Sequence, residues 1–140
     1  MLIELAEPGD IPALCCLLNQ LFEQEAEFSP DPAAQQRGLT RIIADREIGA
    51  ILVARNRQQV IGMVNLLYTV STALGERVAL LEDMVVHSDQ RDTGVGSQLL
   101  EAALHFAAQN GCRRITLLTD ANNDKAQRFY QRHGASADHR

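Results

Sequence analysis

The run from Gln90 to Ser97 has the sequence Gln-Arg-Asp-Thr-Gly-Val-Gly-Ser and combines an arginine with two closely spaced glycines. An apolar stretch typical of a strand precedes it, and a stretch with helical periodicity follows it. The first amides of a helix have no partners within the helix and carry partial positive charge. Glycines let a phosphate approach these amides closely, and the guanidinium of Arg91 can donate several hydrogen bonds to phosphate oxygens. The run therefore predicts a site for a phosphorylated ligand.

Two familiar nucleotide-binding motifs do not fit this run. A dinucleotide-binding fingerprint needs a third glycine where the chain has Leu99. A P-loop needs a lysine followed by serine or threonine after its last glycine, and Lys125 is the only lysine of the chain. The phosphorylated ligand is therefore expected to be of another kind.

Two motifs together resemble the GNAT N-acetyltransferase superfamily. Arg91, Gly94 and Gly96 match that family's pyrophosphate-binding pattern, Gln/Arg-x-x-Gly-x-Gly/Ala, which also follows an apolar strand. The later segment Asn123–Gly134 is similar to the family's Asn-x-x-Ala-x-x-Phe-Tyr-x-x-x-Gly segment. The order of strands and helices matches the family over nearly the whole chain. The resemblance implies an acyltransferase that moves the acetyl group of acetyl-CoA to a primary amine, in a small molecule or a peptide, by direct attack in a ternary complex.

The resemblance also implies where acetyl-CoA would bind, as a co-substrate and without a metal. Backbone groups of the strand before the phosphate run would hold the pantetheine arm, and the run itself would wrap the pyrophosphate. The later segment would face the thiol end. The residues that the resemblance assigns to acetyl-CoA are Met84, Val85, Val86, Arg91, Asp92, Thr93, Gly94, Val95, Gly96, Ser97, Asn123, Ala126 and Phe129.

Attack on a thioester requires a neutral amine. A lysine-like amine has a pKa of about 10.4, so its deprotonation at pH 7 costs roughly 4.6 kcal/mol, and a general base is expected. The resemblance favours Glu82 as this base, because some members carry a glutamate on the corresponding strand, with Asp83 as the alternative. It places Tyr130 as the general acid for the leaving thiolate. Purely structural roles are a surface or ion-paired carboxylate for Glu82 and helix packing for Tyr130.

The chain departs from the family pattern at three points. Asp92 and Thr93 replace the commoner glycine and basic residue, which weakens or removes one phosphate contact. Ala135 stands where a phenylalanine is usual, and residues 136–140 are too few for the family's terminal pair of strands. The expected C-terminal pair is therefore short or missing. These departures leave open a second hypothesis, a non-catalytic acyl-CoA-binding or regulatory module of the same fold.

Apolar periodicity predicts the elements that must position these residues. Strands are expected at 2–6, 50–54, 60–70, 78–86 and 115–119, and helices after the N-cap Asp10, from Asp31 to the stop at Gly49, from Val95 to Asn110-Gly111, and after Asn122 or Asn123. Short connections favour antiparallel neighbours, whereas the strand–helix–strand unit over 78–119 requires a parallel pair. The fold class is α+β, a mixed, mostly antiparallel central sheet flanked by helices. The resemblance adds a bulge at 78–86 and a splayed strand pair that forms the acetyl-CoA cleft.

Composition bounds the remaining possibilities. A length of 140 residues predicts one domain over 1–140. The net charge of −5 is a poor match for nucleic acid, and no apolar stretch is long enough to span a membrane. Cys15, Cys16 and Cys112 lack metal-ligand spacing and fit small buried side chains in a reduced, cytoplasmic protein. A homodimer that completes the short C-terminal sheet edge is expected.

Several other polar residues have less specific patterns. Four histidines form no pair at metal-ligand spacing and are expected at structural or surface positions: His87, His105, His133 and His139. Tyr68 could line the acceptor site, although a strand tyrosine needs no such role. Glu23, Glu25 and Glu27 could attract a cationic acceptor, although a solvated acidic loop is the simpler explanation for them.

Overall fold

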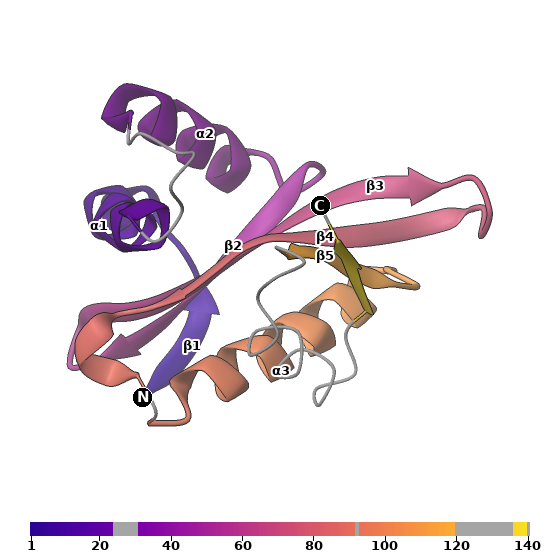
Figure 1. The fold of residues 1–140 in the computed structure, drawn as a ribbon. Coiled ribbons are helices and arrows are strands. Elements are labelled where there is room, and N and C mark those ends of the chain that lie inside the picture. Colours follow the sequence, from indigo (N-terminus) through magenta and orange to yellow (C-terminus); the bar gives the residue numbers. More distant parts are fainter. Residues whose placement is uncertain (24–30, 92, 120–135, 140) are drawn as a thin grey trace.

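The computed structural model describes residues 1–23, 31–91, 93–119 and 136–139, and they form a six-stranded sheet with helices on both faces (Figure 1). The strand order is β1-β2-β3-β4-β5-β6. The first four strands pair antiparallel, and β5 and β6 continue the sheet in parallel. Their bounds are β1 Leu2–Leu5, β2 Gly49–Asn56, β3 Gln59–Ser71, β4 Glu76–Val86, β5 Ile115–Thr119 and β6 Ser136–His139. The predicted mixed, mostly antiparallel sheet is confirmed.

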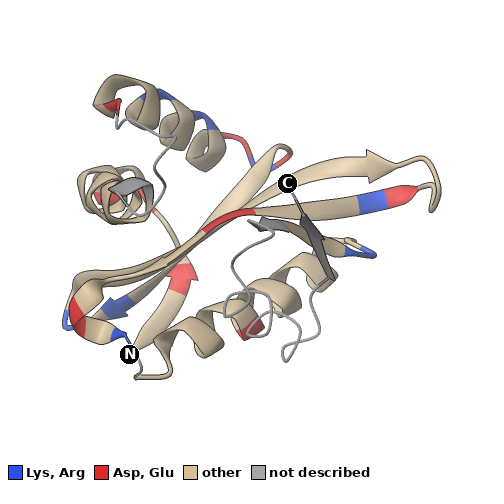
Figure 2. Ribbon diagram, in the orientation of Figure 1, with Lys and Arg blue, Asp and Glu red and all other residues tan. Residues whose placement is uncertain are grey.

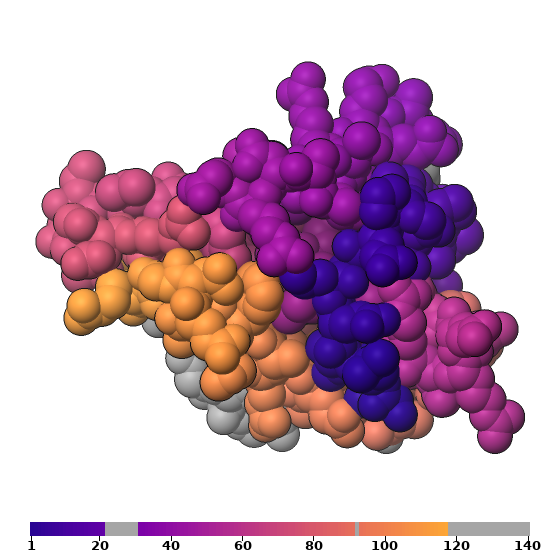
Figure 3. All heavy atoms as spheres, turned by 180° about the vertical axis from the view of Figure 1, so that it is seen from behind, coloured from indigo at the N-terminus to yellow at the C-terminus, as the bar shows by residue number. Residues whose placement is uncertain are grey.

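The helices divide between the two faces of the sheet. Helices α1 (Ile11–Glu23) and α2 (Pro32–Ala44) lie on one face and α3 (Val95–Gln109) on the other (Figure 1). From behind, the indigo and purple N-terminal elements occupy one part of the surface and the orange α3 and β5 another (Figure 3). The sheet is therefore buried from both sides, which explains why β2 and β3 read as nearly continuous apolar runs.

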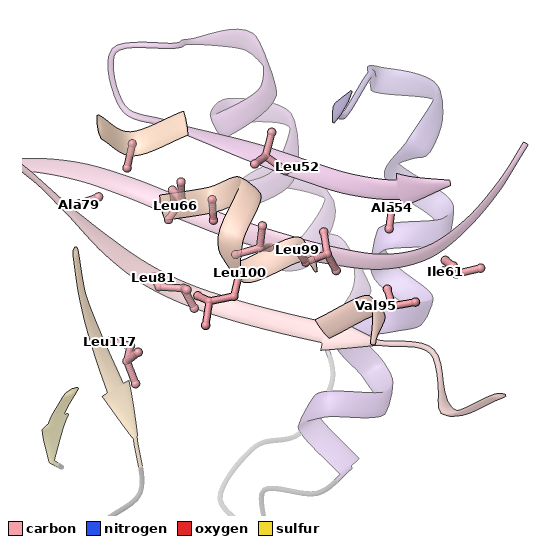
Figure 4. Close-up of a cluster of buried hydrophobic side chains, with 13 residues drawn as sticks. Leu52, Ala54, Ile61, Leu66, Ala79, Leu81, Val95, Leu99, Leu100 and Leu117 are labelled. Carbon is pink, nitrogen blue, oxygen red and sulfur yellow. The ribbon is translucent and has the colours of Figure 1, made fainter. Parts of the chain in front are cut away.

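Each face has its own hydrophobic core. On the α3 face, Val95, Leu99 and Leu100 point from the helix toward strand residues such as Leu66 and Leu81 (Figure 4). On the other face, Leu14, Leu17 and Leu39 of α1 and α2 pack against Ile51 and Met63. The apolar side chains that recur along α3 in the sequence therefore hold the helix against the sheet along its length.

Helix α1 begins directly after Asp10 as predicted, but the cap role of Asp10 and the predicted end of α2 were wrong. Asp10 does not cap α1; it ends a short 3-10 helix (Pro8–Asp10), and its carboxylate accepts hydrogen bonds from the Glu7 amide and from Arg55. Gly49 does not stop α2, which ends at Ala44. Gly49 instead begins β2, and a Cβ added to it would lie 2.3 Å from the backbone oxygen of Leu66. The N-cap Asp31 is as predicted, since its side chain accepts from the Ala34 amide at 3.2 Å.

The C-terminal edge is short, as the sequence predicts. Residues 136–139 form one four-residue strand, β6, and its backbone pairs with Thr116–Thr119 of β5. No helix among the described residues is long and apolar enough to cross a membrane.

Candidate active site

A β-bulge interrupts β4 at Glu82. In the ladder with β3, Asp83 pairs with Asn65 but Leu81 pairs with Leu66, so Glu82 is the additional residue. Leu81 and Met84, on either side of the bulge, both pack into the core under α3. The two carboxylates between them therefore share the opposite face of the sheet, which α1 and α2 cover. Figure 2 shows this acidic segment midway along β4.

The pairing of β4 with β5 stops at the same level. The two strands pair only from Ala79 to Leu81 and from Ile115 to Leu117 within the described ladder. Beyond Leu81, none of the backbone groups of Met84–Val86 pairs with β5 in the described ladder. The edge of a strand can pair with the amides of an extended ligand, as in β-augmentation. The predicted bulge is present, and the end of the described β4–β5 pairing after Leu81 is where the predicted splaying would begin.

The phosphate run lies at the start of α3. Gly94 is the N-cap with φ +87°, a left-handed conformation that favours glycine, and it offers no side chain to cap the helix. The Gln98 amide is the first of the helix to bond back, to the Gly94 oxygen at 3.1 Å. A Cβ on Gly94 would meet no atom of the described residues within 4 Å. Among the described residues, the amides of Val95, Gly96 and Ser97 thus have no hydrogen-bond partner and can bind an anion.

The packing of Val95 holds this helix start in place. Its side chain is buried in the α3 core, and its Cγ1 would lie 3.5 Å from a Cβ added to Gly62 on β3. Before it, residues 88–90 form a 3-10 turn, in which the Asp89 amide donates to His87 Nδ1 at 3.1 Å. Thr93 Oγ1 donates to the Gln90 oxygen, and Arg91 is exposed. His87 therefore has a structural role in this turn.

A polar pair that the sequence analysis missed lies beside the bulge. The Asn65 side chain is 4% exposed, and its Nδ2 donates to Asp83 Oδ2 at 3.3 Å. Among the described residues, nothing donates a hydrogen bond to Asn65 Oδ1. The available signal was a lone asparagine inside the apolar run 60–68.

Tyr68 lies on the face opposite the carboxylates. It packs against the α3 core, and the Arg77 guanidinium lies 4.7 Å from its ring centroid. Burial raises the pKa of its hydroxyl, and the nearby Cys112 adds to the rise. This placement favours packing rather than acceptor binding for Tyr68.

Several predicted site residues lie outside the described part of the chain. They are Asp92, Asn123, Ala126, Phe129 and Tyr130, together with Glu25 and Glu27; for Glu23 the helix backbone is described but the side chain is not. The roles assigned to them stay predictions. The structure brings together Glu82, Asp83 and Met84–Val86 at the place where β4 and β5 part.

Comparison with known proteins identifies the family. The model of the acetyltransferase (GNAT) family matches residues 13–135. This chain belongs to the GNAT family. It is 32% identical over 138 residues to an uncharacterized N-acetyltransferase, YhfO, of Bacillus subtilis, covering 99% of this chain and 91% of the relative. It is 27% identical over 134 residues to aminoalkylphosphonate N-acetyltransferase of Salmonella typhimurium, covering 96% and 84%.

Among solved structures, a protein of Bacillus halodurans described as a transcriptional regulator superposes with a TM-score of 0.84. The two are 31% identical, and the match covers 99% of this GNAT chain and 95% of the other. Family and relatives together make the chain an acyltransferase of a family that uses acetyl-CoA as co-substrate. In the part of this GNAT chain that the structure describes, no three His, Cys, Asp or Glu residues are grouped so as to hold a metal ion.

Proposed function

We propose that this GNAT protein transfers the acetyl group of acetyl-CoA to a primary amine by direct attack in a ternary complex. The observation that carries the proposal is that two features suited to ligand binding follow each other along the chain, one on β4 and one at the start of α3. The amides at the start of α3, which no described side chain caps, suit a pyrophosphate, and the β4 edge beyond its described pairing with β5 suits an amide-bearing arm.

Acetyl-CoA fits these residues by its chemistry. Arg91 is exposed and supplies a guanidinium beside the helix start, where Gly94 leaves open space. Met84–Val86 supply backbone donors and acceptors for the pantetheine amides. Bound acetyl-CoA supplies the electrophile, a thioester carbonyl.

The proposed chemistry moves three protons. Glu82 is exposed at the bulge and takes a proton from the ammonium group, directly or through water. The amine nitrogen then forms a bond to the carbonyl carbon as the carbon–sulfur bond breaks, and the nitrogen loses its second proton to water, which in turn restores the proton that Tyr130 gives up. Tyr130 gives its proton to the leaving thiolate, a transfer that is uphill by roughly 2 kcal/mol at ordinary pKa values of about 10 and 8.5.

The test measures free thiol released from acetyl-CoA with a panel of amines. The panel contains 2-aminoethylphosphonate, because one relative is named for such acceptors, and also spermidine, glycine, an aminoglycoside and a short peptide with a free N-terminus. Thiol release above the amine-free rate, with acetylated amine identified by mass spectrometry, is expected for at least one class. Tight coenzyme A binding without transfer to any amine would contradict the proposal and favour the non-catalytic module.

A further inference from the structure

The Asn65 amide is held in one orientation and leaves one atom unpaired. Its Nδ2 donates to Asp83 Oδ2 at 3.3 Å, so its Oδ1 points away from that carboxylate. The side chain is 4% exposed, and within the described residues no donor reaches Oδ1. A buried acceptor without a partner costs about 1–3 kcal/mol, so a donor from outside the described protein atoms is expected.

Asn65 also lies at the level where the strands separate. It pairs with Asp83, and the next residue, Leu66, pairs with Leu81, the last β4 residue that pairs with β5. Val64 and Leu66 pack into the α3 core, so the Asn65 side chain faces the α1–α2 side. Glu82 and Asp83 lie on that face too. Three hydrogen-bond acceptors from two strands therefore gather at the bulge.

We propose that Asn65 Oδ1 accepts a hydrogen bond from the primary amine of the acceptor substrate, which makes Asn65 a binding residue for the reacting nitrogen. This inference rests on the proposed acetyl transfer to an amine. A primary ammonium group has three N–H donors. One can bond to Asn65 while another gives its proton to the Glu82 carboxylate, and the lone pair that this frees turns to the thioester.

The chemistry of the site also restricts the substrate class. Amide and carboxylate oxygens at the bulge favour a primary ammonium cation at this point. A carboxylate or phosphonate on the same substrate must lie away from the bulge. Its oxygens accept hydrogen bonds, as the oxygens of Asn65, Glu82 and Asp83 do, so the two sets would have no donor between them.

The variant Asn65→Leu tests the hydrogen bond, because it keeps the approximate volume and removes both polar atoms. With the best amine of the panel above, KM for that amine should rise about tenfold or more, while KM for acetyl-CoA stays unchanged. The matched control is Met63→Leu, a fully buried residue two positions earlier on the same strand and face. This control should leave KM for the amine within about twofold of wild type.

A second measurement uses the wild-type protein and does not depend on how well the variant folds. The Asn65 side-chain amide signal in a ¹⁵N NMR spectrum should shift when spermidine or 2-aminoethylphosphonate is added to the coenzyme A complex. Two results would overturn the inference about Asn65 but leave the proposed function intact. One is an equal effect of Asn65→Leu and Met63→Leu on the KM for the amine, and the other is an Asn65 signal that does not move at a saturating concentration of an amine that the enzyme acetylates. A wild-type protein that acetylates no amine would overturn the proposed function as well.

Discussion

The carboxylates of Glu82 and Asp83 illustrate how one additional residue changes what two neighbours can do. In a regular strand, adjacent side chains point to opposite faces. The bulge at Glu82 places both carboxylates on the α1–α2 face, where Asn65 binds the second one. We infer from this contact that Asp83 is held in position, whereas exposed Glu82 is available to exchange protons with a substrate.

Glu82→Gln should therefore lower kcat at pH 7 by about 10²–10⁴-fold, because the amide cannot take a proton from the ammonium group. Activity should recover partly at high pH, where more of the amine is already neutral. Asp83→Asn is the comparison variant, and a smaller loss is expected for it. The measurement is a pH profile of kcat for both variants, and a larger loss in Asp83→Asn would assign the base to Asp83.

At the scale of elements, helix α3 joins the core to the phosphate site. Its first residue is buried against β3, and its first amides follow a glycine N-cap that makes no side-chain cap hydrogen bond. Both ends of the helix carry a left-handed glycine, Gly94 with φ +87° and Gly111 with φ +83°. At neither position would an added Cβ have an atom of the described residues within 4 Å.

This symmetry gives a matched pair of variants, Gly94→Ala and Gly111→Ala. Each should lose about 1–2 kcal/mol of unfolding free energy, because a left-handed alanine is strained. Only Gly94→Ala should also weaken coenzyme A binding, by about tenfold, since its methyl group stands among the phosphate-binding amides. Calorimetric titration with coenzyme A measures the difference; an equal loss of affinity in both variants would contradict a phosphate site at Gly94.

Two further glycines, Gly49 at the start of β2 and Gly38 in α2, should respond to alanine with opposite changes in stability. Gly49→Ala should destabilise the protein by about 1–3 kcal/mol, because its Cβ would lie 2.3 Å from the backbone oxygen of Leu66, which cannot move without disturbing the ladder. Gly38→Ala should instead stabilise it by about 0.5–1 kcal/mol, because Gly38 is exposed inside α2 with open space around it. Urea unfolding of both variants gives the two signs. A stable Gly49→Ala variant would show that the strands can move apart at little cost.

At the scale of the whole molecule, one ion network ties the N-terminal elements to the sheet. Arg55 of β2 bonds to Glu4 of β1 at 2.5 Å and, through two nitrogens, to Asp10 at 2.8 and 2.5 Å. The side chains of Arg55 and Asp10 are 17% and 12% exposed. The hydrogen bonds from Arg55 hold the pKa of Asp10 below its ordinary value, although partial burial opposes them.

A lowered folded-state pKa means that Asp10 stabilises the fold above its unfolded pKa of about 3.9, and that this stability is lost as pH falls through the folded value. Asp10→Asn should therefore cost about 1.5–3 kcal/mol near pH 7, and the cost should shrink as pH falls from 5 toward 3. The control is Glu47→Gln, whose carboxylate binds Arg77 at 2.9 Å but is 83% exposed, and little change is expected. Urea unfolding across this pH range measures both; a cost for Asp10→Asn that does not vary with pH would contradict the role of its charge.

The sequence by itself determined the order of the strands and α-helices from β1 to β5 and pointed to the family, while the helix predicted after Asn122 or Asn123 lies outside the described residues. Apolar periodicity predicted β5 and α3 closely, and Arg91, Gly94 and Gly96 carried the GNAT resemblance, because these signals lie within a few neighbouring residues. Local signals misplaced the roles of Asp10 and Gly49, since contacts with Arg55 and Leu66 decide them.

Only the tertiary structure decided how the acceptor side is arranged. The bulge at Glu82 was expected only from the resemblance, and its position depends on the register between β3 and β4. The Asn65–Asp83 contact joins residues 18 positions apart. No local pattern encodes a register between distant strands, because the packing of both sheet faces must be satisfied together before it is fixed.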